Sequence, residues 1–94
     1  MRLDETERKA LSNAISGIKG EVYLFGSRVD DKKHGGDIDL LIYTKANPYL
    51  TSQNVSVKFQ MECEEKIDVI VMNPEKMTEE QKAFVGTLKC KKIL

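Results

Sequence analysis

The sequence lacks the histidines, the spaced cysteines and the long apolar runs that several functional classes need. His34 is the only histidine among the 94 residues, so a Ser-His triad or a histidine-rich metal site has no parts to work with. The two cysteines, Cys63 and Cys90, show no metal-ligand spacing, and we expect both to be free, reduced thiols. Apolar runs such as Leu40 to Tyr43 are far too short to cross a bilayer.

The chain also has no excess of charge of either sign. Its 15 basic and 15 acidic residues give a formal net charge of zero at pH 7. We therefore expect no extended basic surface for nucleic acid. Charged residues begin at Arg2, which is not the pattern of a secretory signal peptide, so we expect a cytoplasmic protein. The length is that of one small domain, which we place over residues 1–94.

Apolar residues recur along the chain with the periods of helices and strands. We expect strands over residues 21–25, 37–43 and 67–71, and helices over residues 4–19, 51–65 and 79–90. Residues 27–36 are expected to hold a helical turn or two and then a loop. Asp4 with Glu7, and Thr78 with Gln81, fit capping boxes at the start of the first and last helices. The order α-β-α-β-α-β-α predicts an α/β (α+β) domain, in which helices pack on a small mixed sheet.

Two carboxylates open the second expected strand. Asp37 and Asp39 follow the breaker pair Gly35-Gly36 and precede the apolar run Leu40 to Tyr43. Because successive side chains of a strand alternate between its faces, these two point the same way, about 7 Å apart along the backbone. Two like charges side by side repel each other. A divalent cation with oxygen ligands is the natural group to lie between them.

A third carboxylate, Asp68, is the one charged interior position of the apolar run over residues 67–71. Three carboxylates on neighbouring strands can hold two Mg²⁺ ions, which clamp the attacking and leaving oxygens of a phosphoryl displacement. Taken alone, the pair Asp37 and Asp39 is equally well explained as solvated acids at the start of a strand, and Asp68 alone is better explained in that way. The order of the whole set favours a site.

Three residues at the end of the first strand are candidates for binding phosphate. Gly26 has no Cβ, so the backbone there can come close to a phosphate. Ser27 can cap a short helix whose free N–H groups bind that phosphate. Arg28 can reach a triphosphate as a fork of donors, or form a surface ion pair with Asp30 or Asp31, and the sequence favours neither.

Other chemistries that use an Asp-x-Asp pair do not fit this chain. Haloacid-dehalogenase-type phosphatases place the pair at the end of an apolar strand, whereas Asp37 and Asp39 come before it. An EF-hand needs a glycine and further oxygen ligands after the pair, and Leu40-Leu41-Ile42 supplies none. No Walker A motif is present.

The ordered set of motifs resembles a known superfamily. Gly26-Ser27, a spacer, the Asp37-x-Asp39 pair in an apolar strand and the later Asp68 strand look like the DNA polymerase β-type nucleotidyltransferases. The small size resembles the minimal nucleotidyltransferase branch, often encoded beside HEPN-domain proteins as toxin–antitoxin pairs. The resemblance covers about residues 5–87.

This resemblance implies a fold, an activity and a partner. It implies transfer of a nucleoside monophosphate, AMP from ATP, to a hydroxyl of a HEPN-type protein, with two Mg²⁺ ions as cofactors. Asp37 and Asp39 would coordinate both metals, and Asp68 would ligate the metal facing the acceptor and take the proton of the attacking hydroxyl. Gly26 and Ser27 would hold the β- and γ-phosphates. The alternative is a partner-binding module that keeps the fold without the chemistry.

Residues 51–65 carry two conflicting patterns. Val55, Val57 and Phe59 alternate with polar residues, as in a strand. A helix would instead gather Val55, Phe59 and Cys63 on one face. The resemblance favours the helix, as a crossover between the strands of Asp39 and Asp68.

Overall fold

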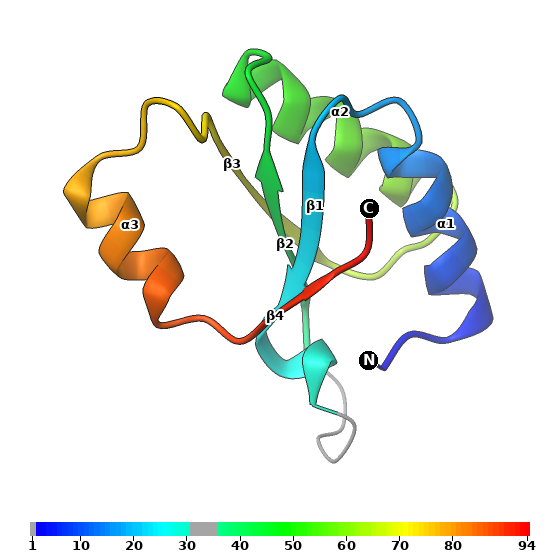
Figure 1. The fold of residues 1–94 in the computed structure, drawn as a ribbon. Coiled ribbons are helices and arrows are strands. Elements are labelled where there is room, and N and C mark those ends of the chain that lie inside the picture. Colours follow the sequence, from blue (N-terminus) through cyan, green and yellow to red (C-terminus); the bar gives the residue numbers. More distant parts are fainter. Residues whose placement is uncertain (1, 31–35) are drawn as a thin grey trace.

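The computed structural model describes residues 2–30 and 36–94, so Asp31, His34 and Gly35 lie outside the described residues. The order of elements is α1 (Glu5–Ile15), β1 (Glu21–Phe25), the 3₁₀ turn η1 (Gly26–Val29), β2 (Ile38–Tyr43), α2 (Pro48–Gln60), β3 (Ile67–Met72), α3 (Glu79–Gly86) and β4 (Cys90–Lys92) (Figure 1). The expected α/β (α+β) fold, with its α-β-α-β-α-β-α order, is confirmed, with one additional strand.

The four strands form one mixed sheet in the order β3-β2-β1-β4. β1 runs antiparallel to both β2 and β4, whereas β2 and β3 are parallel. The connection between β2 and β3 passes through α2, since parallel neighbours need a crossover. Residues 51–65 therefore follow the helical alternative over most of their length.

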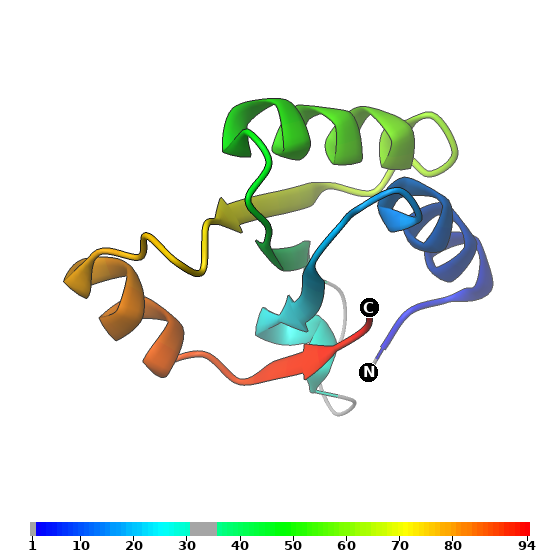
Figure 2. The ribbon, with the colours of Figure 1, turned by 45° about the horizontal axis from the view of Figure 1, so that its top comes forward.

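The two faces of the sheet are covered by different helices (Figures 1 and 2). On one face, Leu24, Leu40 and Phe59 are fully buried in a core formed with α1 and α2. On the other face, Phe25 and Leu41 form a smaller cluster with side chains of α3 and its flanking loops. β2 contributes to both clusters, which confirms that its apolar run is buried on both faces.

Local sequence signals explain where the helices begin. Both capping boxes are present, Asp4 with Glu7 at α1 and Thr78 with Gln81 at α3. At α2, the side chain of Asn47 caps the first turn and Pro48 occupies a first-turn position, where its missing N–H costs no hydrogen bond.

All three helices end earlier than the sequence predicted, and α2 runs from Pro48 to Gln60 rather than over residues 51–65. α1 ends at Ile15 rather than residue 19, and Gly17, a poor helix former, follows two residues later. α3 ends at Gly86 rather than residue 90. The chain then turns back, and Cys90 and Lys92 pair with Phe25 and Tyr23 of β1.

Strand β4 is an element that the sequence did not predict. All three of its residues are exposed, so no buried face marks it in the sequence. Cys63 and Cys90 are both free, as predicted, the first buried and the second exposed. Over the described residues, no helix is long and apolar enough to cross a membrane.

Candidate functional site

Two of the three predicted acids are direct neighbours in the sheet. Asp39 of β2 is the register partner of Asp68 of β3 in the parallel pair. Paired residues of adjacent strands point to the same face, and adjacent strands lie about 4.8 Å apart. The face is the one that carries Phe25 and Leu41, opposite α1 and α2. One ligand can therefore contact both carboxylates on this face of the sheet.

Gly26 brings the end of β1 directly against Asp39. Its φ of 76° is in the left-handed region, and a Cβ built there would collide with the Asp39 carboxylate. The register also pairs Phe25, the preceding residue, with Asp39. Any other residue at position 26 would be strained and would displace the carboxylate.

The electrostatics of Asp39 reflect this crowding. Burial is the main cause that raises the pKa of the Asp39 carboxyl, and the charges of Asp68 and Asp37 raise it further. The positive charge of Lys66 lowers it in part. A bound cation would relieve the penalty that these groups place on the ionised form.

Asp37 is held differently from the other two acids. It is exposed and lies just before β2, and its Oδ2 is 3.5 Å from the Nζ of Lys66. Exposed pairs of this kind are worth little and separate easily. Within residues 2–30 and 36–94, no three His, Cys, Asp or Glu side chains are gathered closely enough to hold a metal ion.

The sequence suggested that Ser27 caps a short helix, and the structure shows that it does not. The turn η1 begins at Gly26 with Phe25 in the capping position, and no side chain caps it. Ser27 lies inside the turn because the left-handed glycine, rather than the serine, starts it. Its hydroxyl lies against Gly36, where a Cβ would collide with the Ser27 Oγ. Ser27 thus connects the turn to the residue that precedes Asp37.

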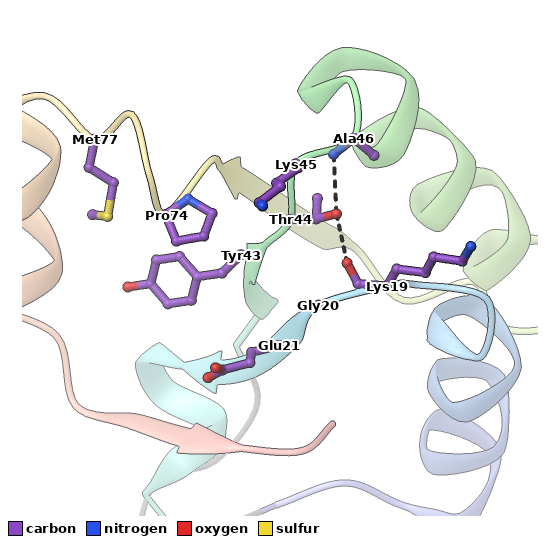
Figure 3. A pocket seen from close by; sticks show the side chains of 9 residues that line it. All are labelled: Lys19, Gly20, Glu21, Tyr43, Thr44, Lys45, Ala46, Pro74 and Met77. Atoms are coloured by element: carbon purple, nitrogen blue, oxygen red, sulfur yellow. Dashed lines mark hydrogen bonds between the residues drawn. The ribbon is translucent and has the colours of Figure 1, made fainter.

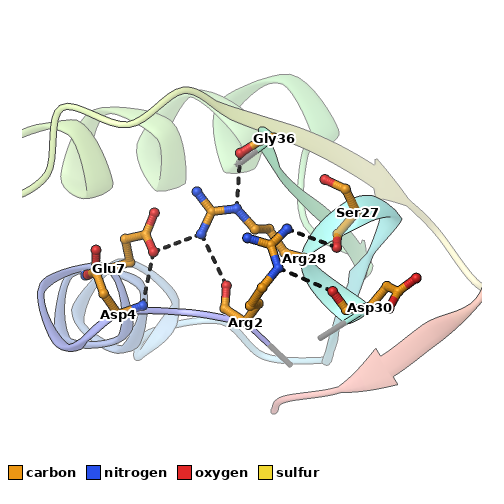
Figure 4. A network of polar contacts seen from close by, with 7 residues as sticks. All are labelled: Arg2, Asp4, Glu7, Ser27, Arg28, Asp30 and Gly36. Carbon is orange, nitrogen blue, oxygen red and sulfur yellow. Dashed lines mark hydrogen bonds and ion pairs between the residues drawn. The ribbon is translucent and has the colours of Figure 1, made fainter. Parts of the chain in front are cut away.

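Arg28 is buried rather than at the surface, with 7% of its surface exposed (Figure 4). Its Nη1 donates to Glu7 Oε1 at 2.8 Å and to the carbonyl of Arg2 at 3.1 Å. Its Nε donates to the carbonyl of Gly36 at 3.0 Å. The ion pair of Arg28 shown here is with Glu7 of α1, an alternative that the sequence did not suggest.

Glu7 is the functional neighbour that sequence reasoning missed. Only 3% of it is exposed, and glutamate is almost never buried unless it is paired. Burial raises its pKa, but the hydrogen bonds from Arg28 and from the Asp4 N–H, together with the positive charges of Arg28 and Arg2, outweigh burial, so the pKa is lowered overall. The sequence assigned Glu7 to the capping box, which it also forms, and nothing local indicates the second contact.

The Glu7–Arg28 pair fixes both ends of the connection between β1 and β2. Arg28 belongs to the turn after β1, and Gly36 is the last residue before Asp37. Both are fastened to α1 through one guanidinium (Figure 4). The ends of the loop that present Ser27 and Asp37 are therefore positioned by a buried pair on the opposite side of the sheet from α3.

A hollow of the surface lies away from these carboxylates (Figure 3). It is an open, mostly apolar cavity of about 840 Å³ beside the ring of Tyr43, and it is lined by Lys19, Gly20, Glu21, Tyr43, Thr44, Lys45, Ala46, Pro74 and Met77. Tyr43 is four residues beyond Asp39, or about 13 Å along the strand. The carboxylates take no part in this cavity.

A small mixed sheet with adjacent carboxylates beside a glycine-serine turn is the arrangement of a nucleotidyltransferase domain. The family described as polymerase beta, nucleotidyltransferase matches residues 16–90, and the chain belongs to this family. The matched span contains Gly26, Asp37, Asp39 and Asp68. No curated protein matches the chain.

Proposed function

We propose that this chain is a divalent-metal-dependent nucleotidyltransferase that transfers AMP from ATP to a hydroxyl of a partner protein. The observation that carries the proposal is the register of Asp39 and Asp68, two carboxylates side by side in a domain of the nucleotidyltransferase family. Burial, and then the charge of the adjacent Asp68, raise the pKa of Asp39 in the free protein, and a positively charged ligand would favour its ionised form.

The donor set fits Mg²⁺. Asp37, Asp39 and Asp68 offer only carboxylate oxygens, which hard divalent cations prefer. Asp37 would have to leave Lys66 for the third carboxylate to join the set, at little cost for an exposed pair. When bound, the cation neutralises the triphosphate and stabilises the charge that develops during transfer.

The residues of the chain have separate roles in this proposal. Gly26 lets the backbone approach the phosphates, and the Ser27 hydroxyl donates to one of their oxygens. Asp68 takes the proton from the acceptor hydroxyl, and the oxygen of that hydroxyl forms a bond to the α-phosphorus. The bond from that phosphorus to pyrophosphate breaks, and pyrophosphate leaves with its electron pair. Arg28 connects the turn η1 to α1 through its hydrogen bond to Glu7. Its direct contact with a phosphate is a secondary role in this proposal.

The acceptor is proposed to be a HEPN-type protein, with this chain as the antitoxin of a toxin–antitoxin pair. This part rests on the resemblance to minimal nucleotidyltransferases and on the formal net charge of zero. A chain without excess positive charge is poorly suited to hold a nucleic-acid acceptor by itself.

One observation favours the alternative, a partner-binding module without catalysis. The three acids are not gathered into a metal site in the described part of the chain, and Asp37 is paired with Lys66. Calorimetry of ATP binding with and without Mg²⁺ separates the two functions. A catalytic site requires Mg²⁺-dependent binding that Asp39→Asn removes, whereas a pure binding module shows no such heat.

The transfer itself is tested by co-expression with the neighbouring reading frame and intact-mass measurement of its product. We expect the partner to gain the mass of AMP with the native chain and with Glu75→Gln, an exposed acid away from the site. The gain should vanish with Asp39→Asn. Incorporation of nucleotide into RNA by the chain alone, with an unmodified partner, would refute the proposed acceptor.

A further inference from the structure

One positively charged side chain lies among the carboxylates of the site. Lys66 directly precedes β3, and its Nζ is 3.5 Å from Asp37 Oδ2. The parallel register of β2 and β3 begins with Ile38 opposite Ile67, and the Ile38 N–H donates to the carbonyl of Lys66 at 3.2 Å. One residue earlier on each strand, Asp37 and Lys66 are opposite each other. The pairing of the two strands therefore brings this lysine to Asp37.

Lys66 lies on the same face of the sheet as the three acids. Side chains two residues apart on a strand point the same way, so Lys66 shares a face with Asp68, as Asp37 does with Asp39. Asp39 and Asp68 are the next opposed pair on this face. The face thus carries three carboxylates and one ammonium group, which supplies part of the positive charge that the carboxylates require.

The charge of Lys66 also acts on Asp39. Burial, and then the charges of Asp68 and Asp37, raise the pKa of the Asp39 carboxyl, and Lys66 opposes them. A lysine ammonium is a compact point charge on a flexible stem. The Lys66 side chain is 70% exposed, and an exposed ion pair separates easily. Lys66 can therefore leave Asp37 when another anion is offered to it.

The phosphate position of the proposed function is close to this pair. The Ser27 hydroxyl lies against Gly36, which directly precedes Asp37. A phosphate bound by Ser27 would therefore be near Asp37 and the lysine that pairs with it. Phosphate oxygens are acceptors for a lysine ammonium, as carboxylate oxygens are.

We propose that Lys66 is a positioning residue that pairs with Asp37 in the free protein and moves to the triphosphate when ATP and the divalent cation bind together. This inference rests on the proposed function. An ammonium group and a divalent cation repel each other, so they compete for Asp37. The triphosphate gives Lys66 a new anionic partner and leaves Asp37 to the cation. Lys66 thereby makes metal binding depend on the nucleotide.

The exchange predicts opposite effects of a single substitution. Lys66→Gln should tighten binding of the cation alone, because Asp37 no longer has a competing partner. It should weaken binding of the nucleotide in the presence of the cation, because the phosphates lose a contact. Each effect should be about threefold to fivefold, the range that an exposed charge pair provides.

The full chain is titrated with Mn²⁺, whose unbound form is measured by electron paramagnetic resonance. Calorimetry at saturating Mn²⁺ measures the affinity for α,β-methylene-ATP, from which pyrophosphate cannot leave. Lys66→Arg keeps the charge and should behave like the native chain. The matched control is Lys45→Gln, because Lys45 is 69% exposed and pairs with Glu75 at 3.0 Å, away from the carboxylate site. It should change neither affinity, and circular dichroism checks that each variant is folded.

The Asp37→Asn background tests whether Asp37 is the point of competition. There, adding Lys66→Gln should change the Mn²⁺ affinity by less than about twofold. The inference is overturned if Lys66→Gln leaves the Mn²⁺ affinity of the native chain unchanged, acts equally in Asp37→Asn, or is matched by Lys45→Gln. In those cases nucleotide binding that needs the cation and Asp39 would still support the proposed function. If no variant binds Mn²⁺, with or without nucleotide, both are overturned.

Discussion

Replacing Glu7 by glutamine tests whether the buried pair with Arg28 holds the domain together. Glutamine is nearly the same size, and its carbonyl oxygen can still accept from Arg28 and from the Asp4 N–H. The substitution removes the negative charge alone. It leaves the Arg28 guanidinium, 7% exposed, without the carboxylate of its ion pair.

The magnitude follows from the burial of the pair. Removing one member of a buried ion pair costs about 3–5 kcal/mol. Because glutamine keeps the hydrogen bonds, we expect a smaller loss of about 2 kcal/mol. A domain of this size unfolds with a free energy of about 5–14 kcal/mol, so the loss is a considerable fraction of it. At about 4–8 °C per kcal/mol, the melting temperature should fall by about 8–16 °C.

The matched control is Glu75→Gln. Glu75 also forms an ion pair, 3.0 Å from Lys45, but both side chains are mostly exposed. Its loss should change the free energy of unfolding by at most about 0.5 kcal/mol. Urea denaturation followed by circular dichroism measures both variants under the same conditions. Equal effects of the two substitutions would refute the claim that the Glu7–Arg28 pair is a buried structural element.

The pH dependence gives a second readout for the same pair. The pKa of Glu7 is lowered in the folded protein, so its ionised form is favoured by folding. The stabilisation is complete above its ordinary pKa of 4.5 and is lost as the pH falls through the lower, folded value. The stability difference between the native chain and Glu7→Gln should therefore be constant from pH 6 to 7 and shrink below pH 4.5. A difference that does not change with pH would indicate that charge is not involved.

Two further substitutions probe the carboxylate site, and a third is a control. Asp39→Asn should raise the melting temperature at pH 7, because folding raises the pKa of the Asp39 carboxyl, so that its charge destabilises the folded state above that pKa. An unchanged or lower melting temperature in calorimetry would contradict this expectation. Gly26→Ala should destabilise by about 1–3 kcal/mol in urea denaturation, because alanine at φ 76° is strained and strikes the Asp39 carboxylate. Gly86→Ala, in α3 with open space for a Cβ, should instead be neutral or stabilising by up to about 1 kcal/mol. If Gly26→Ala and Gly86→Ala changed the free energy of unfolding with the same sign, the close approach at Gly26 would be unimportant.

Much of the fold could be predicted from the sequence because it is signalled locally. The apolar runs of β1, β2 and β3 lie where they were expected, within one residue at each end. Strand β4 was missed because its three residues are all exposed and its pairing with β1 depends on the turn after Gly86. Helix α2 was ambiguous because Val57 is apolar without being buried, which creates a strand-like alternation in a helix.

The site carboxylates could be predicted from local sequence signals, whereas the Glu7–Arg28 pair that positions the adjoining turn could not. Asp39 and Asp68 stand out because each interrupts an apolar strand, and two parallel neighbours in register bring them together. Glu7 is 21 residues from Arg28, on a helix where a glutamate already has a local role as a cap. Its burial results from the packing of α1 on the sheet, which no local pattern specifies. A sequence motif can therefore locate the acids of this site, while the contact that positions the adjoining turn is found only in the tertiary structure.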